Sequence, residues 1–289
     1  MRVDKRKRRL KRKIIFYITR TAMVVAGVLV ISGAIMTTKK LIVDAGDKND
    51  DKNIYKNVKT LSEKIAKEDV KKYMSKPSDK PEPDWSTIPD NLKKLYDNNK
   101  DARQFVIDYN RNKDKKYDID LSEYENYDKV PLLMQWDERW GYKNYSGNLF
   151  GLSGCGPTAL SMAAIYITGD SKYTPQWMMD YSTKNGYSVE GSGSSWMLMS
   201  DGARGIGLSS KELPLDESVM KNALRDKCVI IAIMGPGDFT DSGHFIVITG
   251  YNEDSKTFTI NDSNSYSNSR KRWNFDKISG QIKDMWKIS

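Results

Sequence analysis

The stretch LSGCGPTALSMAA, residues 152–164, decides the expected fold, because it places a cysteine where a helix should begin. Pro157 tolerates the first helical turn, where its missing N–H would have no partner, so the pattern predicts a helix from Cys155 to about Ile167. A thiol at this position meets the positive end of the helix dipole, which favours the nucleophilic thiolate. The glycine on each side leaves room to approach the sulfur. The stretch alone does not separate a nucleophile from a small buried cysteine beside a Gly-Pro turn.

Positive charge is concentrated at the start of the chain. The 289 residues carry a formal net charge of +9. Residues 1–13 contain nine Lys or Arg and one Asp, a net of +8, which leaves +1 for the rest of the chain. Nucleic-acid binding depends on clustered basic residues, so the nearly neutral remainder argues against a nucleic-acid partner.

Two cysteines and one histidine restrict the possible chemistry. Cys155 and Cys228 are too few for a disulfide-rich scaffold, and a single disulfide between them would consume the candidate nucleophile. Cys228 heads an apolar run and is expected to be a buried, inert thiol. Any mechanism that needs an imidazole must use His244, the one histidine. We expect no metal site and no organic cofactor.

An apolar segment, residues 14–38, follows the basic tail of residues 1–13. Its uncharged part would span about 27 Å as a helix, near the ~30 Å hydrocarbon thickness of a bilayer. Positive flanks stay in the cytoplasm, so we expect a single-pass signal-anchor in the cell membrane with the rest of the chain outside. The alternative is a secreted protein, released by cleavage near the small residues Ser32 and Ala34.

The next two segments differ from each other in composition. Residues 39–88 are rich in Lys and Asp and poor in apolar side chains, and four prolines fall between residues 75 and 90, so a charged stalk or linker is expected. Residues 89–125 carry apolar side chains at helical spacing. They predict two short helices that pack as a lead-in on the following domain.

Residues 126–289 have the composition of a folded domain, with frequent Trp, Gly and β-branched residues. Helical patterns dominate up to residue 227, with a weak one at 196–203 and a clear one at 215–227. Strands are predicted at residues 228–234, 244–251, 256–262 and 282–288. Helices first and an antiparallel sheet afterwards define an α+β domain.

A hairpin is predicted to bring an acid to His244. The residue opens the strand 244–251, and a turn at residues 252–255 returns the next strand to its start, beside Asn261 or Asp262. A carboxylate there would fix the ring tautomer and stabilise imidazolium, leaving the other nitrogen for the thiol. The residues alone also allow a histidine satisfied at a strand end, with Asp262 an ordinary turn residue.

Two further features suit a catalytic site. Gln135 carries a side-chain amide that can donate to an oxyanion together with the backbone N–H of Cys155, although composition alone favours a surface glutamine. The loop GSGSSW, residues 191–196, suits the lining of a substrate groove, although tryptophan more often packs in a core or rim. The groove candidates are Trp196, Ser195, Gly154 and Gly243.

A known family carries the same combination of segments: QWDERWG, GLSGCGPT, GSGSSW, GPGDFTDSGHFIVITGY and NDSNS. Over about residues 126–289 the chain resembles exported bacterial proteins of cysteine peptidase family thirty-nine. These are relatives of the peptidases that cut double-glycine leaders from bacteriocins, on a papain-like fold. The lead-in from Pro89 resembles them too, and no ATP-binding cassette follows, which disfavours a transporter's leader peptidase.

The resemblance implies a role for each candidate. Cys155 would be the nucleophile, His244 the base, Asp262 the orienting acid and Gln135 the oxyanion-hole donor. Relatives usually read Asn-Asp-Pro where this chain has Ser263, and the change is expected to loosen the loop that holds the acid.

The combined prediction is a membrane-anchored, extracytoplasmic cysteine peptidase. It would hydrolyse a peptide or amide bond through a Cys-His-Asp triad and a thioester intermediate. Its partners would be a peptide or protein substrate, the membrane through residues 14–38, and the cell wall as a further candidate. Two alternatives on the same fold are a catalytically silent peptide- or wall-binding module and a cell-wall amidase or transpeptidase.

Overall fold

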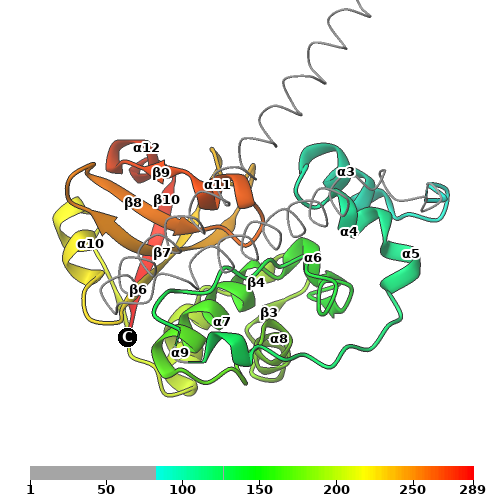
Figure 1. The fold of residues 1–289 in the computed structure, drawn as a ribbon, viewed down its shortest axis with the longest axis horizontal. Coiled ribbons are helices and arrows are strands. Elements are labelled where there is room, and N and C mark those ends of the chain that lie inside the picture. Colours follow the sequence, from blue (N-terminus) through cyan, green and yellow to red (C-terminus); the bar gives the residue numbers. More distant parts are fainter. Residues whose placement is uncertain (1–82, 126) are drawn as a thin grey trace, which may run out of the picture. The chain divides into compact units, whose positions relative to one another are not determined.

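The structure is a computed structural model that describes residues 83–125 and 127–289 (Figure 1). A six-stranded antiparallel sheet forms most of its C-terminal half. Its strands lie in the order β5 (Ser210–Glu212), β10 (Ile282–Ile288), β6 (Val229–Met234), β7 (His244–Asn252), β8 (Thr257–Asn261) and β9 (Arg272–Trp273). All neighbouring strands are antiparallel. The four strands expected from the sequence are confirmed, whereas the short edge strands β5 and β9 were not expected.

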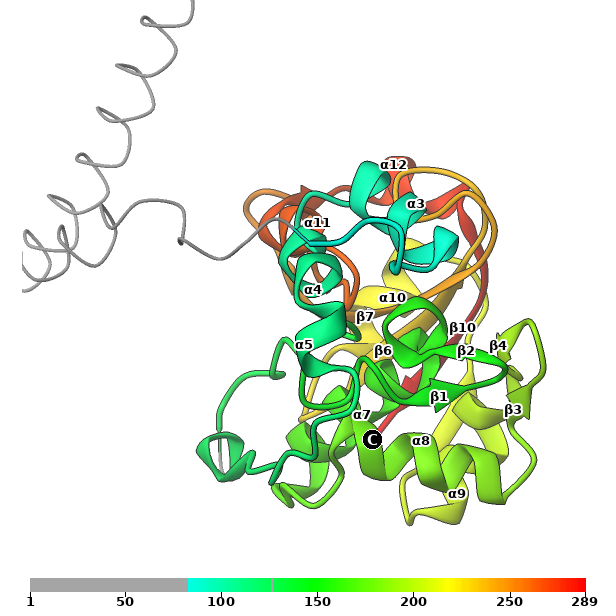
Figure 2. The ribbon, with the colours of Figure 1, turned by 90° about the vertical axis from the view of Figure 1, so that its right-hand side faces the viewer.

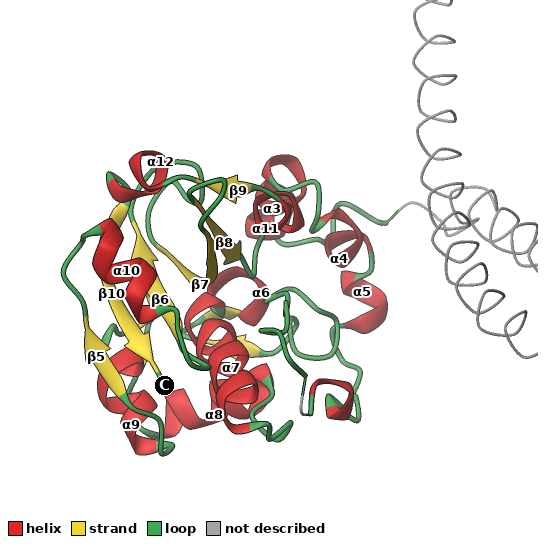
Figure 3. Cartoon of the chain, turned by 60° about the vertical axis from the view of Figure 1, so that its left-hand side comes forward, coloured by secondary structure: helices red, strands yellow, loops and turns green. Residues whose placement is uncertain are grey.

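Both faces of this sheet are covered by helices. In β6 the odd-numbered residues belong to the core shared with α7 (Cys155–Thr168) and α8 (Pro175–Lys184). The even-numbered residues belong to the core shared with α10 (Glu217–Ala223) and α12 (Phe275–Ser279). Figure 3 shows α7 and α10 on opposite sides of the strands. Because side chains alternate along a strand, a continuous apolar run is what a strand buried on both faces requires.

The cysteine helix α7 begins at Cys155 and ends at Thr168, which confirms the predicted helix to within one residue. Pro157 lies in the first turn, and Gly169 ends the helix in the left-handed conformation with φ of 73°. The helix is buried from Gly156 to Ile165 and packs on β7 and β6. Its first turn places the thiol beside the first residues of β7, an interior strand of the sheet.

The two glycines beside the thiol serve packing. A Cβ atom at Gly154 would lie 2.6 Å from the Phe150 ring, and one at Gly156 would lie 2.5 Å from the Ser194 hydroxyl. Neighbouring residues already fill the space that these Cβ atoms would occupy, so close packing requires glycine at both positions. The expectation that the glycines leave room to approach the sulfur stays a prediction. Gly154 is buried, so it lines no open groove.

The lead-in consists of α3 (Asp90–Asn98), α4 (Arg103–Ile107) and α5 (Tyr109–Asn112) (Figure 2). Phe105 of α4 stacks on Tyr142 with ring centroids 4.2 Å apart. Ile88 joins the same cluster and is fully packed, so residues 83–88, expected in the stalk, contact the folded unit.

Shorter elements complete the described chain: η1 (Ser122–Tyr124), β1 (Asn144–Tyr145), β2 (Asn148–Leu149), α6 (Phe150–Ser153), β3 (Ser188–Val189), β4 (Gly193–Ser194), η2 (Leu198–Gly202), α9 (Ala203–Gly205) and α11 (Tyr266–Arg270). The weak helical pattern at 196–203 forms a π-type turn, η2, followed by α9. The predicted helix at 215–227 is shorter, because α10 ends at Ala223.

The expected membrane anchor, residues 14–38, lies outside the described residues. Within residues 83–125 and 127–289 no helix combines the length and apolar character needed to span a bilayer.

Candidate active site

The Cys155 sulfur lies where α7 begins, against the first residues of β7. Burial raises the pKa of the thiol, but the hydrogen bond and the charge of His244 outweigh burial and lower the pKa below that of an ordinary thiol. Backbone N–H groups of Phe245 and Gly156 act in the same direction. The site therefore favours the thiolate, the nucleophilic form of cysteine.

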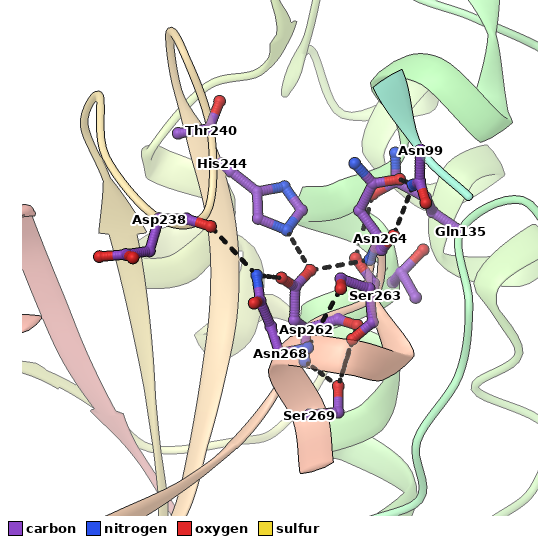
Figure 4. Close-up of polar contacts among 12 residues, drawn as sticks. Asn99, Gln135, Asp238, Thr240, His244, Asp262, Ser263, Asn264, Asn268 and Ser269 are labelled. Carbon is purple, nitrogen blue, oxygen red and sulfur yellow. Dashed lines mark hydrogen bonds and ion pairs between the residues drawn. The ribbon is translucent and has the colours of Figure 1, made fainter. Parts of the chain in front are cut away.

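His244 joins the sulfur to a carboxylate. Its Nε2 atom lies 2.8 Å from Oδ1 of Asp262, and the two residues are 5% and 1% exposed (Figure 4). Because Nε2 faces the carboxylate, the hydrogen bond to Cys155 uses the other ring nitrogen, Nδ1. Burial lowers the pKa of His244, but the charge and hydrogen bond of Asp262, aided by Cys155, raise it to about 10. At neutral pH the site therefore favours the protonated ring, with the Asp262 carboxylate on one side and the Cys155 sulfur on the other.

The Asp262 carboxylate is held on both oxygens. Oδ1 also accepts the backbone N–H of Asn264 at 2.9 Å, and Oδ2 accepts Nδ2 of Asn268 at 2.9 Å. Burial raises the pKa of Asp262, but the positive charge of His244 and these hydrogen bonds outweigh burial and lower it. The carboxylate is a fixed, ionised acceptor for the histidine ring.

The register of the β7–β8 hairpin explains why Asp262 meets His244. Val247 pairs with Asn261, so Asp262 leaves the end of β8 beside the first residues of β7. The hairpin spacing alone allowed either Asn261 or Asp262 beside His244, and the family resemblance implied Asp262. The Asn261 amide instead donates to the carbonyls of Val130 and Pro131, at 3.1 and 3.0 Å.

Gln135 is buried, with 3% of its surface exposed, and is not a surface glutamine. Its Nε2 donates to the Gly151 carbonyl at 3.0 Å, and its Oε1 accepts the Ser263 hydroxyl at 3.1 Å. Gly151 belongs to α6, the turn that leads into α7, so the amide is fixed to the approach of the cysteine helix. A primary amide has two N–H donors, and Gly151 occupies one of them.

The residues expected to line a substrate groove differ in how much of their surface is exposed. Trp196 is 47% exposed and makes an edge contact with Trp286 at 6.3 Å between ring centroids. Ser195 is half-buried next to it, and Gly243 is exposed directly before His244. Cys228 is buried, and its thiol donates to the Asp226 carbonyl at 3.3 Å.

Sequence reasoning missed the residues around the acid. We call residues 261–264 the acid loop. Asn268 and Ser263 each bond a predicted site residue, and the density of Asn and Ser in NDSNSYSNS is the signal that could have found them. Among the described residues no three His, Cys, Asp or Glu side chains are grouped to hold a metal ion.

Comparison with known proteins shows which family this chain matches. Residues 127–289 match the Peptidase_C39 like family. None of the curated proteins matches the chain. Among solved structures, the chain is similar to the peptidase domain of Streptococcus ComA, a bi-functional ABC transporter involved in a quorum sensing pathway. The identity is 14% and the TM-score 0.38, over 47% of this chain and 91% of that domain.

Proposed function

This chain belongs to the Peptidase_C39 like family, and from that membership we propose that it is a cysteine peptidase with Cys155 as its nucleophile. The observation that carries the proposal is the buried His244 ring, which is bonded to the Asp262 carboxylate on one side and to the Cys155 sulfur on the other. A thiolate–imidazolium pair requires a thiol with a lowered pKa in contact with an imidazole with a raised pKa. Cys155 and His244 meet both conditions. The nucleophile opens a helix and the base opens a sheet strand, as in a papain-like arrangement.

The proposed reaction proceeds through a thioester. The Cys155 thiolate adds to the carbonyl carbon of the scissile amide, and the carbonyl π electrons move to oxygen. The free N–H of the Gln135 amide and the Cys155 backbone N–H stabilise this oxyanion. Nδ1 of His244 then gives its proton to the nitrogen of the leaving amine as the C–N bond breaks.

Hydrolysis of the thioester reverses these roles. Neutral His244 removes a proton from water, the hydroxide adds to the thioester carbon, and the C–S bond breaks to give the acid and the thiolate. Asp262 stays ionised throughout, keeps Nε2 protonated and stabilises the imidazolium.

We further propose that residues 14–38 anchor the protein in the cell membrane, with the catalytic domain outside the cytoplasm. The support is the basic tail of residues 1–13 followed by a long apolar run. In a bacterial host, the full-length chain is expected in the membrane fraction, with Met1 retained or removed as the only N-terminal change. Protease added to intact spheroplasts should digest the domain. A mature chain that begins near Ile35, found in the medium, contradicts the anchor.

Alkylation across pH tests the thiolate. Iodoacetamide is expected to label Cys155 rapidly at pH 5–6, well below the pKa of about 8.5 of a free thiol, because the imidazolium holds the sulfur ionised. His244→Ala should abolish labelling at this pH and move it above about pH 8. Mass spectrometry of tryptic peptides identifies the labelled cysteine and separates Cys155 from Cys228.

The same measurement addresses the silent-module alternative. A binding module that has lost catalysis needs no ionised thiol. If Cys155 of the wild-type protein reacts no faster at pH 5–6 than it does in His244→Ala, the peptidase proposal is wrong.

A further inference from the structure

Ser263 connects the acid loop to the candidate oxyanion donor. It follows Asp262 directly and is fully buried. Its hydroxyl donates to Oε1 of Gln135 at 3.1 Å, and its carbonyl accepts the Gln135 backbone N–H at 2.9 Å (Figure 4). The sequence predicted that a serine here loosens the loop, and this stays a prediction. The serine also gives the loop a side-chain bond to residue 135 that a proline could not make.

The orientation of the Gln135 amide follows from its two partners. The Gly151 carbonyl can only accept, so the amide nitrogen must face it and the amide oxygen must face Ser263. The hydroxyl is then required to donate to that oxygen. A donor on the carbonyl end holds the amide plane and polarises the amide, which strengthens its N–H groups as donors. Without the hydroxyl, a buried amide oxygen would lose its partner.

The side chains of the acid loop hold it in a fixed position, because they bond the stretch 130–135, the His244 ring and the lead-in. Asn261 bonds the carbonyls of Val130 and Pro131, and Asp262 bonds the His244 ring. Asn264 accepts the amide of Asn99 from the lead-in, through both its carbonyl and its side chain. Ser263 therefore acts from a loop that is tied on both sides of it.

We propose that Ser263 is a positioning residue that sets the orientation of the Gln135 amide and so couples the acid and the oxyanion donor. This inference rests on the proposed function, because it needs Gln135 to stabilise an oxyanion. This role predicts that loss of the Ser263 hydroxyl affects one kind of reaction and not another. Ser263→Ala weakens steps that develop charge on a carbonyl oxygen and leaves the reactivity of the Cys155 thiolate intact.

Two reactions of the same sulfur separate these effects. The burst of p-nitrophenolate from p-nitrophenyl acetate reports acylation, which passes through an oxyanion, whereas iodoacetamide alkylation reports only the thiolate. Ser263→Ala is expected to slow acylation roughly tenfold, the effect of one lost hydrogen bond. Its iodoacetamide rate and pH profile should match the wild type. The control Ser161→Ala removes another fully buried serine hydroxyl, which bonds the Tyr173 carbonyl, and should slow neither reaction.

A double-mutant cycle tests the role of Ser263 separately from the proposed oxyanion role of Gln135. Gln135→Ala alone is expected to slow acylation by about 10²–10³-fold. Adding Ser263→Ala should change this rate no further, because the serine acts through the glutamine. An additive effect, a normal acylation rate in Ser263→Ala, or equal slowing of both reactions overturns the role of Ser263. An unchanged acylation rate in Gln135→Ala instead overturns the oxyanion role of Gln135. Thermal unfolding of each variant identifies a loss that comes from misfolding.

Discussion

Cys155→Ser is expected to lower turnover of p-nitrophenyl acetate by about 10⁴-fold or more. The exchange replaces one atom and leaves the fold of α7 unchanged. The reason lies in the base. Asp262 holds the pKa of His244 far above neutrality, so the ring is already protonated and cannot take a proton from a serine hydroxyl. A thiol depends less on such a step, because His244 lowers the pKa of Cys155 and so favours the thiolate.

The matched control is Cys228→Ser. Cys228 is buried at the start of β6, and its thiol donates to a carbonyl that a hydroxyl can also reach. Turnover should remain at the wild-type level. If Cys155→Ser keeps a tenth or more of the wild-type rate, the sulfur is not the nucleophile.

Asp262→Asn is expected to reduce turnover by up to about 10⁴-fold and the free energy of unfolding by about 3–5 kcal/mol at neutral pH. The substitution removes the negative charge that stabilises the imidazolium. It also places an NH₂ group where Oδ2 accepts the Asn268 amide, so two donors face each other. The exposed Asp254→Asn, in the turn of the same hairpin, is the matched control and should change neither quantity.

The stability difference should depend on pH with a defined sign. Asp262 has a lowered pKa in the folded protein, so its contribution is present above its ordinary value of 3.8 and is lost as pH falls through the folded value. His244 has a raised pKa, so its contribution is complete below 6.5 and is lost as pH rises toward about 10. Unfolding temperatures of wild type and Asp262→Asn should therefore differ most between pH 4 and 6.5. A difference that is constant across pH would contradict the ion pair.

The sequence predicted the helix at Cys155 and the strands at residues 228–234 and 244–251, because each depends on a local pattern. A glycine and a proline mark the helix start, and long apolar runs mark strands covered on both sides. The approach of Asp262 to His244 was also within reach, because a hairpin fixes which residues lie opposite one another.

Contacts between segments that are distant in the chain could not be predicted from the sequence. The choice between Asn261 and Asp262 depends on carbonyls at residues 130–131, far from both in the chain. Burial of Gln135 depends on Ser263 and on the turn α6, and no local pattern encodes either contact. Edge strands of two or three residues carry too little periodicity to be recognised.

The acid loop also determines when the protein acquires a reactive sulfur. The helix that carries Cys155 lies well before residues 261–264 in the chain, so it leaves the ribosome earlier. Until the loop docks, the imidazole lacks its carboxylate and the sulfur keeps the reactivity of an ordinary thiol. If Cys155 is the nucleophile that we propose, a nascent or misfolded copy therefore lacks the lowered thiol pKa on which the proposed hydrolysis depends.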